Sequence, residues 1–266
     1  MKKETKLFGS ESAHWYAEDG TPVFEVEKAN GKGKTKTTLT QARKLGLYPS
    51  VTSIFKLLDK PQVNEWQLNH LLKAVQDTGI TGDGLSTYEF KQILLSHTDK
   101  ARSEGADEGT KIHEAAEKYL IDGIEPDNDK YFYICQGIKK LLPGGEVLCE
   151  ESYTSTVYGY SGTVDISVDD GEYLYICDLK TTSDKNFDSY LKKPYDTWIM
   201  QLAAYSHFFN YEAEKIKLVS IVANRDNGEV GSYVWTEEEE ERGWDMFKNL
   251  LDYWYLRHRY EVKKLI

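Results

Sequence analysis

The chain has 266 residues, of which 40% are hydrophobic and 29% charged, and its formal net charge is −11. This is the composition of an ordinary globular protein, and the length suits one large domain or two small ones. No apolar run approaches the roughly 18 residues that a membrane span needs. The charged start, Met1 to Lys6, has no apolar segment after it, so no signal peptide is expected.

Three cysteines, Cys135, Cys149 and Cys177, stand apart in the sequence and form no CxxC pair. A sparse and odd set of this kind is typical of free thiols in a reducing compartment. We therefore expect a cytoplasmic protein.

The first 48 residues predict a small β-rich part. Residues 14–16 and 23–26 have the aromatic and branched side chains of strands, and Asp19-Gly20 between them is typical of a turn. The polar residues 31–36 are expected to form a flexible loop.

Helices are predicted from there to residue 142. Thr40 is expected to cap a short helix that ends at Gly46, and Pro49-Ser50 opens another. Residues 62–142 have a mostly helical pattern, with a capping box that starts at Ser86.

The second half of the chain alternates strands with helices. Pro143-Gly144-Gly145 ends the helical region, and a capping box from Thr236 to Glu239 opens a long final helix. Between them we predict strands at 146–157, 162–169, 172–181, 215–224 and 230–235, and a helix at 195–210. This order of elements predicts an α/β fold.

Two of these strands carry charged residues among apolar ones, at Asp165 and at Asp178 with Lys180. Residues two apart in a strand point to the same face, so Asp178 and Lys180 project together. If the two strands pair as a hairpin, Asp165 approaches the same place. Two carboxylates can hold a divalent metal, and a lysine beside them can steady a hydroxide or an anionic transition state.

This arrangement resembles the PD-(D/E)xK nuclease superfamily. Asp165 corresponds to its first acid, and Asp178-Leu179-Lys180 corresponds to its (D/E)xK motif. Val164 stands where the proline of the motif would be.

Two further motifs resemble the RecB-like exonuclease branch of this superfamily. Gly109 and His113 form a GxxxH motif before the core strands, and Gln201 and Tyr205 form a QxxxY motif on the helix after them. The segment from Pro49 to Ile54 is similar to the front of phage exonucleases and mitochondrial genome maintenance exonucleases. The resemblance spans roughly residues 48 to 210.

The resemblance implies a restriction-endonuclease-like core, in which helices flank a mixed central sheet and a helical subregion precedes the core strands. We expect a single nuclease domain over residues 1–266. It would comprise a β-rich part at 1–48, a helical subregion with the GxxxH helix at 49–142, and the core sheet with its flanking helices at 143–266.

The resemblance also implies a metal site. Asp165 and Asp178 would bind Mg²⁺ or Mn²⁺, and His113, the carbonyl of Leu179 and Glu117 would be further ligands. Either one metal ion or two would take part in catalysis. The relatives that hold an iron–sulfur cluster bind it with four cysteines, so the three cysteines of this chain predict none.

The remaining site residues would assist catalysis. Lys180 would orient or deprotonate the attacking water, and Gln201 and Tyr205 would line the site and steady the lysine or the DNA. Each residue also has a structural interpretation. Asp178 and Lys180 would form a simple ion pair, His113 would pack in the core, and Gln201 and Tyr205 would be a polar pair on a core helix.

DNA with a free single-stranded end is the expected partner. Trp66, Trp198 and Tyr195 are candidates for stacking on bases, although most of the aromatic residues, 13% of the chain, must serve the core or surface. The net charge is unusual for a DNA-binding protein, so the basic path would be narrow and its affinity sensitive to salt. Lysines gather in two groups, namely Lys32, Lys34 and Lys36, and Lys185, Lys192 and Lys193.

The resemblance thus implies a metal-dependent exonuclease acting on linear DNA in recombination, replication or repair, in a bacterial cell or a phage-infected host. A recombination protein such as a single-strand annealing protein is a possible partner; a membrane is not. Two alternatives stay open. One is a sequence-specific or structure-specific endonuclease of the same superfamily, and the other is a non-catalytic DNA-binding protein with a degenerate nuclease fold.

Overall fold

The structure is a computed structural model that describes residues 14–28, 30–59, 61–79 and 82–261. The side chain of Trp66, one of the base-stacking candidates, lies outside the described set. None of the helices within these ranges has an apolar stretch long enough to cross a bilayer.

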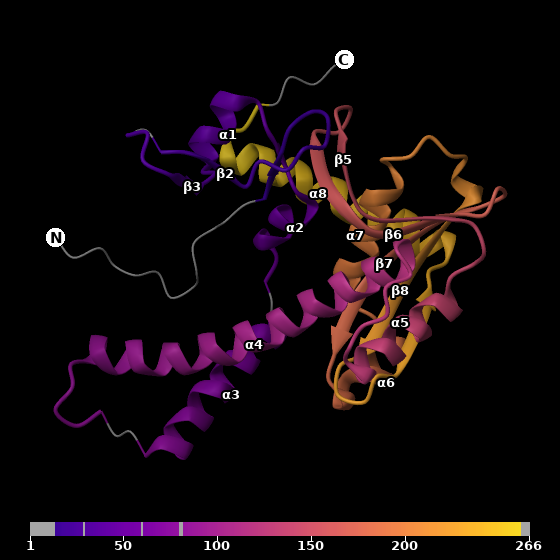
Figure 1. Cartoon of the computed structure of the whole chain (residues 1–266). Coiled ribbons are helices and arrows are strands. Elements are labelled where there is room, and N and C mark those ends of the chain that lie inside the picture. The colour runs from indigo at the N-terminus through magenta and orange to yellow at the C-terminus, as the bar shows by residue number, and fades with distance from the viewer. Residues whose placement is uncertain (1–13, 29, 60, 80–81, 262–266) are drawn as a thin grey trace.

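A mixed five-stranded sheet forms the centre of the fold (Figure 1). Its strands are β5 (Glu146–Ser155), β6 (Tyr160–Asp169), β7 (Leu174–Thr182), β8 (Ile216–Asn224) and β9 (Val230–Val234). They lie in sequence order; β5, β6 and β7 are antiparallel, β8 runs parallel to β7, and β9 is antiparallel to β8. Parallel neighbours need a long crossover, which contains α6 (Asp184–Lys192) and α7 (Asp196–Ser206).

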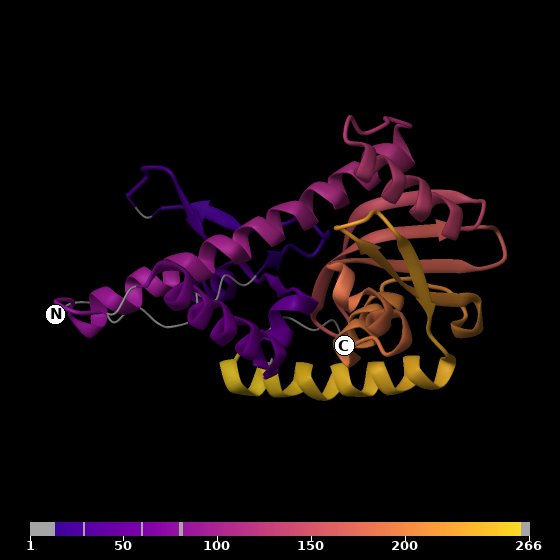
Figure 2. The ribbon, with the colours of Figure 1, turned by 90° about the horizontal axis from the view of Figure 1, so that it is seen from below.

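Helices cover both faces of this sheet. Ile176 of β7 packs with α7 and α8 (Glu237–His258) in one layer. Leu179 of the same strand packs with α4 (Thr87–Ile121) and α5 (Asp129–Leu141) in the other. Odd and even positions of the strand therefore enter different layers, as its two-residue period requires. Figure 2 shows α8 and α4 on opposite sides of the sheet.

The helical subregion is dominated by α4, which is 35 residues long. Together with α3 (Pro61–Thr78) it forms a hairpin that projects away from the sheet, as Figure 1 shows. Ser86 caps α4, and Glu89 completes the predicted capping box. The far end of α4 reaches the sheet, so one helix connects the projecting hairpin to the core.

The N-terminal part is a set of short elements at one end of the sheet. They are β1 (Trp15–Tyr16), β2 (Glu25–Glu27), β3 (Lys34–Lys36), α1 (Leu39–Leu45), β4 (Tyr48–Pro49), α2 (Val51–Ile54) and the 3₁₀ turn η1 (Phe55–Leu57); a second turn, η2 (Ala213–Lys215), precedes β8. Trp15 lies against Trp254 of α8 and Tyr260, so this part shares the main hydrophobic core.

The predicted α/β class is confirmed. The order of helix, three strands, helix and strand is the one expected for a restriction-endonuclease-like core, with the helical subregion before the core strands. Two local predictions are wrong. The supposed loop at 31–36 contains β3, which pairs with β2, and the cap of α1 is Thr38 rather than Thr40. Ser50 is buried and caps α2 by accepting the Ser53 N–H at 3.0 Å.

Candidate metal and catalytic site

The site begins where strands β6 and β7 separate. Their ladder runs from the pair Asp169–Leu174 to the pair Ile166–Cys177 and ends there, one step before Asp165 and Asp178 would face each other. Beyond that point, Oδ2 of Asp165 accepts the backbone N–H of Leu179 at 2.8 Å. A side chain thus takes the place of a strand partner, and the backbone around Leu179 is held away from β6.

The opened edge of β7 faces helix α4 at His113. Nε2 of His113 lies 3.0 Å from the carbonyl oxygen of Leu179, and Nδ1 lies 3.9 Å from Oδ2 of Asp165. Gly109, one turn earlier, allows this approach, because a Cβ there would lie 3.1 Å from Oγ1 of Thr181. The GxxxH spacing therefore has a physical cause: the glycine brings the helix close and the histidine reaches the strand.

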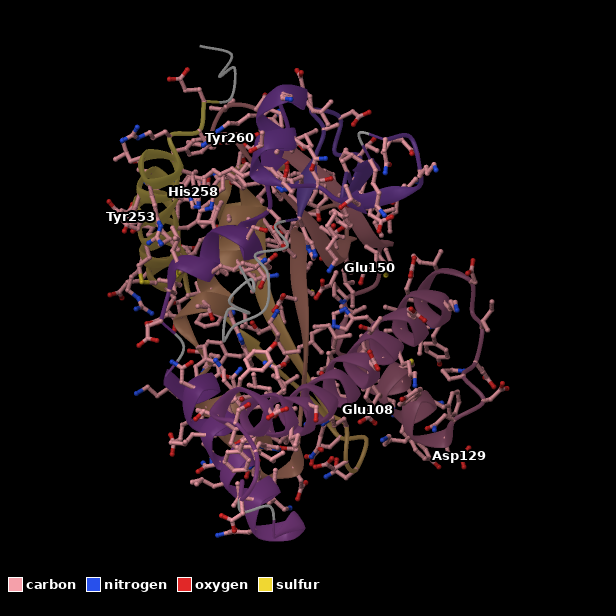
Figure 3. All side chains as sticks on the ribbon, turned by 90° about the vertical axis from the view of Figure 1, so that its left-hand side faces the viewer. Glu108, Asp129, Glu150, Tyr253, His258 and Tyr260 are labelled. Atoms are coloured by element: carbon pink, nitrogen blue, oxygen red, sulfur yellow. The ribbon has the colours of Figure 1, made fainter. Side chains whose placement is uncertain are left out.

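A carboxylate that the sequence analysis did not select completes this group. Glu150 of β5 stands between Cys149 and Glu151, which pair with the two neighbours of Asp165, and its backbone has a φ of 54°, in the left-handed region. Oε1 of Glu150 is 3.3 Å from Nδ1 of His113. Figure 3 shows Glu150 between the N-terminal elements and α4. Non-glycine residues with positive φ are uncommon and gather at functional sites, so this conformation adds support for a site here.

Glu117 lies one turn beyond His113, and both line an open pocket of about 470 Å³ with Glu150. Within the described residues, the glutamate in contact with His113 is Glu150. Ligand atoms of His113, Glu150 and Asp165 all lie within 4.8 Å of one another. The structure therefore brings Glu117 to the edge of the group and places Glu150 inside it.

Asp178 and Lys180 start a second chain of contacts, on the α7 side of β7. Nζ of Lys180 donates to Oδ1 of Asp178 at 2.5 Å and to Oε1 of Gln201 at 3.3 Å. Nε2 of Gln201 in turn donates to the hydroxyl of Tyr205 at 3.1 Å. All four predicted residues are thus in one hydrogen-bonded chain, and Gln201 and Tyr205 are almost fully buried.

The other oxygen of Asp178 is the unusual atom of the site. Asp178 is fully buried, and its Oδ2 has no hydrogen-bond partner among the residues that the structure describes. A buried carboxylate oxygen without a partner is costly. The cost is removed if a cation binds there. Among the described residues, the group of ligand atoms within 4.8 Å of one another does not include Asp178, but the charge of Asp178 acts on both Asp165 and His113. The oxygen and imidazole donors of these residues are of the kind that Mg²⁺ or Mn²⁺ takes. The residues present therefore fit a divalent metal.

Burial and the second aspartate raise the pKa of Asp165 to about 7. Burial lowers the pKa of His113, but the hydrogen bond to Glu150 and the charge of Asp165 outweigh it, so the pKa of His113 lies above its ordinary value. Without a metal, the group therefore retains protons that an exposed carboxylate would lose.

These pKa shifts predict how the stability of the metal-free protein depends on pH. The folded pKa of Asp165 is about 7, whereas an unfolded aspartate has a pKa of about 4. The folded state therefore binds more protons between these values, and the free energy of unfolding should fall as pH rises, by at most about 1.4 kcal/mol per pH unit for each proton. The raised pKa of His113 likewise makes the free energy of unfolding fall as pH rises. Urea unfolding in chelator from pH 4.5 to 8 measures the slope, which Asp165→Asn should flatten; an equal slope in that variant would contradict the assignment.

The absence of a side chain at Gly162 leaves room for the ring of Tyr205. A Cβ at Gly162 would lie 2.5 Å from Cε1 of Tyr205, so Gly162→Ala should displace that ring and lower the free energy of unfolding by about 1–3 kcal/mol. Urea denaturation measures the change. Gly144→Ala is the matched control, because nothing lies within 4 Å of its added Cβ. Equal stability of the two variants would show that Tyr205 does not depend on this contact.

The comparisons with known proteins give little further guidance. A scan against protein-family models and a search of curated proteins both give no match. Among solved structures, the chain is similar to one from Eubacterium rectale named "Putative exonuclease", with 13% identity and a TM-score of 0.38, covering 85% of this chain and 87% of that one. A likeness this distant carries no argument about the chemistry.

Proposed function

We propose that this chain is a metal-dependent deoxyribonuclease of the PD-(D/E)xK superfamily, in its RecB-like branch, and that it acts as an exonuclease on linear DNA. The observation that carries the proposal is the buried Oδ2 of Asp178, which lacks a partner. Asp178 directly precedes Leu179, whose backbone contacts both Asp165 and His113. A simple ion pair with Lys180 accounts for one oxygen of this carboxylate and leaves the other unexplained.

The metal would be Mg²⁺ or Mn²⁺, held by Asp165, Asp178, the carbonyl of Leu179 and His113. Glu150 joins this set because it contacts His113 directly, and Glu117 remains a candidate from the pocket wall. The chemistry that such a metal supplies when bound is polarisation of the scissile phosphate and a lowered pKa of its water. An imidazole donor favours Mn²⁺ over Mg²⁺.

Lys180 would act on the water and on the phosphate. Its side chain is one-quarter exposed, so the ammonium group can reach both Asp178 and a substrate beside it. Gln201 holds Lys180 from the other side and is itself held by Tyr205. With its position fixed before substrate arrives, Lys180 can orient the attacking water and offset the negative charge that develops on phosphorus.

The substrate would be a DNA strand with a free end. The projecting α3–α4 hairpin and the N-terminal elements flank the side of the sheet on which Glu150 lies (Figure 3), and we infer that a single strand enters between them. We also infer that residues 1–266 act as one nuclease domain, because the N-terminal part packs in the same core as α8. A single-strand annealing protein is a suitable partner for such an enzyme.

One assay tests the proposal. Purified protein is incubated with end-labelled linear and circular DNA, single-stranded and double-stranded, in Mn²⁺, Mg²⁺ or chelator. We expect metal-dependent loss of linear single strands and survival of single-stranded circles. Circles cut as fast as linear DNA would make the protein an endonuclease, and binding without cutting in either metal would make it a non-catalytic DNA-binding protein.

A further inference from the structure

An aromatic cluster lies beside the site and has no part in the chemistry proposed above. Tyr190 at the end of α6 and Tyr195 and Trp198 at the start of α7 meet edge to face, with ring centroids 5.2 to 5.8 Å apart. Trp198 is buried, whereas Tyr195 is 37% exposed. The cluster therefore has a rigid base in the core and a ring at the surface.

Two features place this cluster near Lys180. Thr182, which lies two residues beyond Lys180 on the same face of β7, is close enough to Tyr190 to influence the pKa of its hydroxyl. At a strand rise of about 3.3 Å per residue, Thr182 is about 7 Å from Lys180. Trp198 also precedes Gln201, the partner of Lys180, by one helical turn. The cluster thus lies at the end of β7 that follows Lys180, with Thr182 between the lysine and Tyr190.

Four cations belong to the segments around the cluster, although the chain as a whole is acidic. The backbone N–H of Arg225 donates to the carbonyl of Thr182 at 2.9 Å, which fixes Arg225 at the same end of β7. The charge of Arg225 also acts on Tyr190. Lys185, Lys192 and Lys193 belong to α6 and its C-terminal cap. In the described part of the chain, none of these four cations forms an ion pair.

Several acids of the same region are engaged elsewhere. Oδ1 of Asp184 accepts the side-chain amides of Asn224 and Asn227, and Oδ2 of Asp226 accepts the backbone N–H of Asp184. Asp196 is paired with Arg242 at 2.9 Å. Because none of the four cations is paired with these acids within the described residues, the cations are available to phosphates beside an exposed aromatic ring, which is the combination that binds single-stranded nucleic acid.

We propose that Tyr195, supported by Tyr190 and Trp198, stacks on the unpaired base of the nucleotide next to the scissile phosphate, while Arg225 contacts that nucleotide's phosphate. The ligand is therefore a single-stranded DNA end. A base inside a duplex is stacked on its neighbours and cannot take this place. Every base has a flat face, so the subsite would select single strands without selecting a sequence. The proposal rests on the proposed nuclease function.

The first test measures stacking without cleavage. An oligothymidylate with one 2-aminopurine near its end is bound in chelator, and quenching of the fluorescent base is followed at each position. We expect quenching at one position, its loss in Tyr195→Leu with affinity about tenfold weaker, and its retention in Tyr195→Phe. Tyr253→Leu is the control, because Tyr253 is a half-exposed tyrosine of α8 (Figure 3). Equal quenching in Tyr195→Leu and the wild type would overturn the proposal.

A second test needs no variant and so cannot fail through misfolding. The wild-type protein in Mn²⁺ is given linear single strands with one abasic nucleotide in place of the stacked one. We expect KM to rise about tenfold with kcat little changed. If intact and abasic strands are cut at the same rate, the stacking proposal is contradicted and the proposed nuclease function is not. If no DNA is cut at all, the proposed function fails and the subsite fails with it.

Discussion

Asp178→Asn should abolish DNA hydrolysis, with a loss of about a thousandfold or more in kcat, while the protein still folds. The substitution keeps the volume of a fully buried side chain and removes its charge. It deletes a metal ligand that supplies several kcal/mol of transition-state stabilisation, and each 1.4 kcal/mol is about tenfold in rate. Initial rates on linear single-stranded DNA and far-ultraviolet circular dichroism measure the two expectations.

The effect of metal on stability gives the same variant a second readout. In the wild type, Mn²⁺ should raise the melting temperature, because binding to the folded state alone stabilises it, and in Asp178→Asn this rise should disappear. Asp252→Asn is the control, since Asp252 is an exposed acid of α8 far along the chain from the site. Substantial residual activity in a well-folded Asp178→Asn protein would remove Asp178 from the metal site.

Much of this site could be predicted because its spacings are local. The two-residue period of a strand predicts that Asp178 and Lys180 project together, and their side chains are in contact. The four-residue spacing of a helix predicts that Gln201 and Tyr205 meet, and they are hydrogen-bonded. In both cases backbone geometry fixes the neighbours, whatever the rest of the chain does.

Glu150 was missed because its position depends on pairing between strands. It lies level with Asp165 only in the register that the turn after Ser155 imposes, and the sequence analysis predicted the strands without that register. Its left-handed backbone is also unpredictable from a glutamate. The sequence of Glu150-Glu151 is therefore typical of an ordinary exposed strand. Glu150 could have been predicted only by aligning the two strands of the hairpin, which brings it level with Asp165.

The wrong prediction of a loop at 31–36 has a similar cause. Lys34 to Lys36 is polar and partly exposed, so it lacks the apolar alternation that identifies a strand. It becomes β3 because β2 lies beside it and a glycine with positive φ, Gly33, allows the turn between them. Helix α6 was missed because Phe187 is the only buried residue among the nine. Short elements of this kind are fixed by neighbours rather than by their own pattern.

Lys180→Ala should also lose about a thousandfold in kcat. Its response to metal should be the opposite of that of Asp178→Asn. Removal of the lysine leaves the carboxylate of Asp178 buried without its partner at 2.5 Å. That unpaired charge should lower the stability of the metal-free protein by up to about 3 kcal/mol. A divalent metal would then neutralise the same carboxylate, so Mn²⁺ should raise the melting temperature of Lys180→Ala by more than it raises that of the wild type.

The measurements are single-turnover rates, melting curves with and without Mn²⁺, and calorimetric titration with Mn²⁺, using Lys140→Ala as an exposed control on α5. Retained metal binding with lost turnover would assign Lys180 to the chemical step, because it would then act where charge develops and not where the metal is held. Lost metal binding with unchanged turnover per bound metal would instead make Lys180 a structural partner of Asp178. In that case Gln201 and Tyr205 would serve the fold of the site, and the attacking water would have to be oriented by another group.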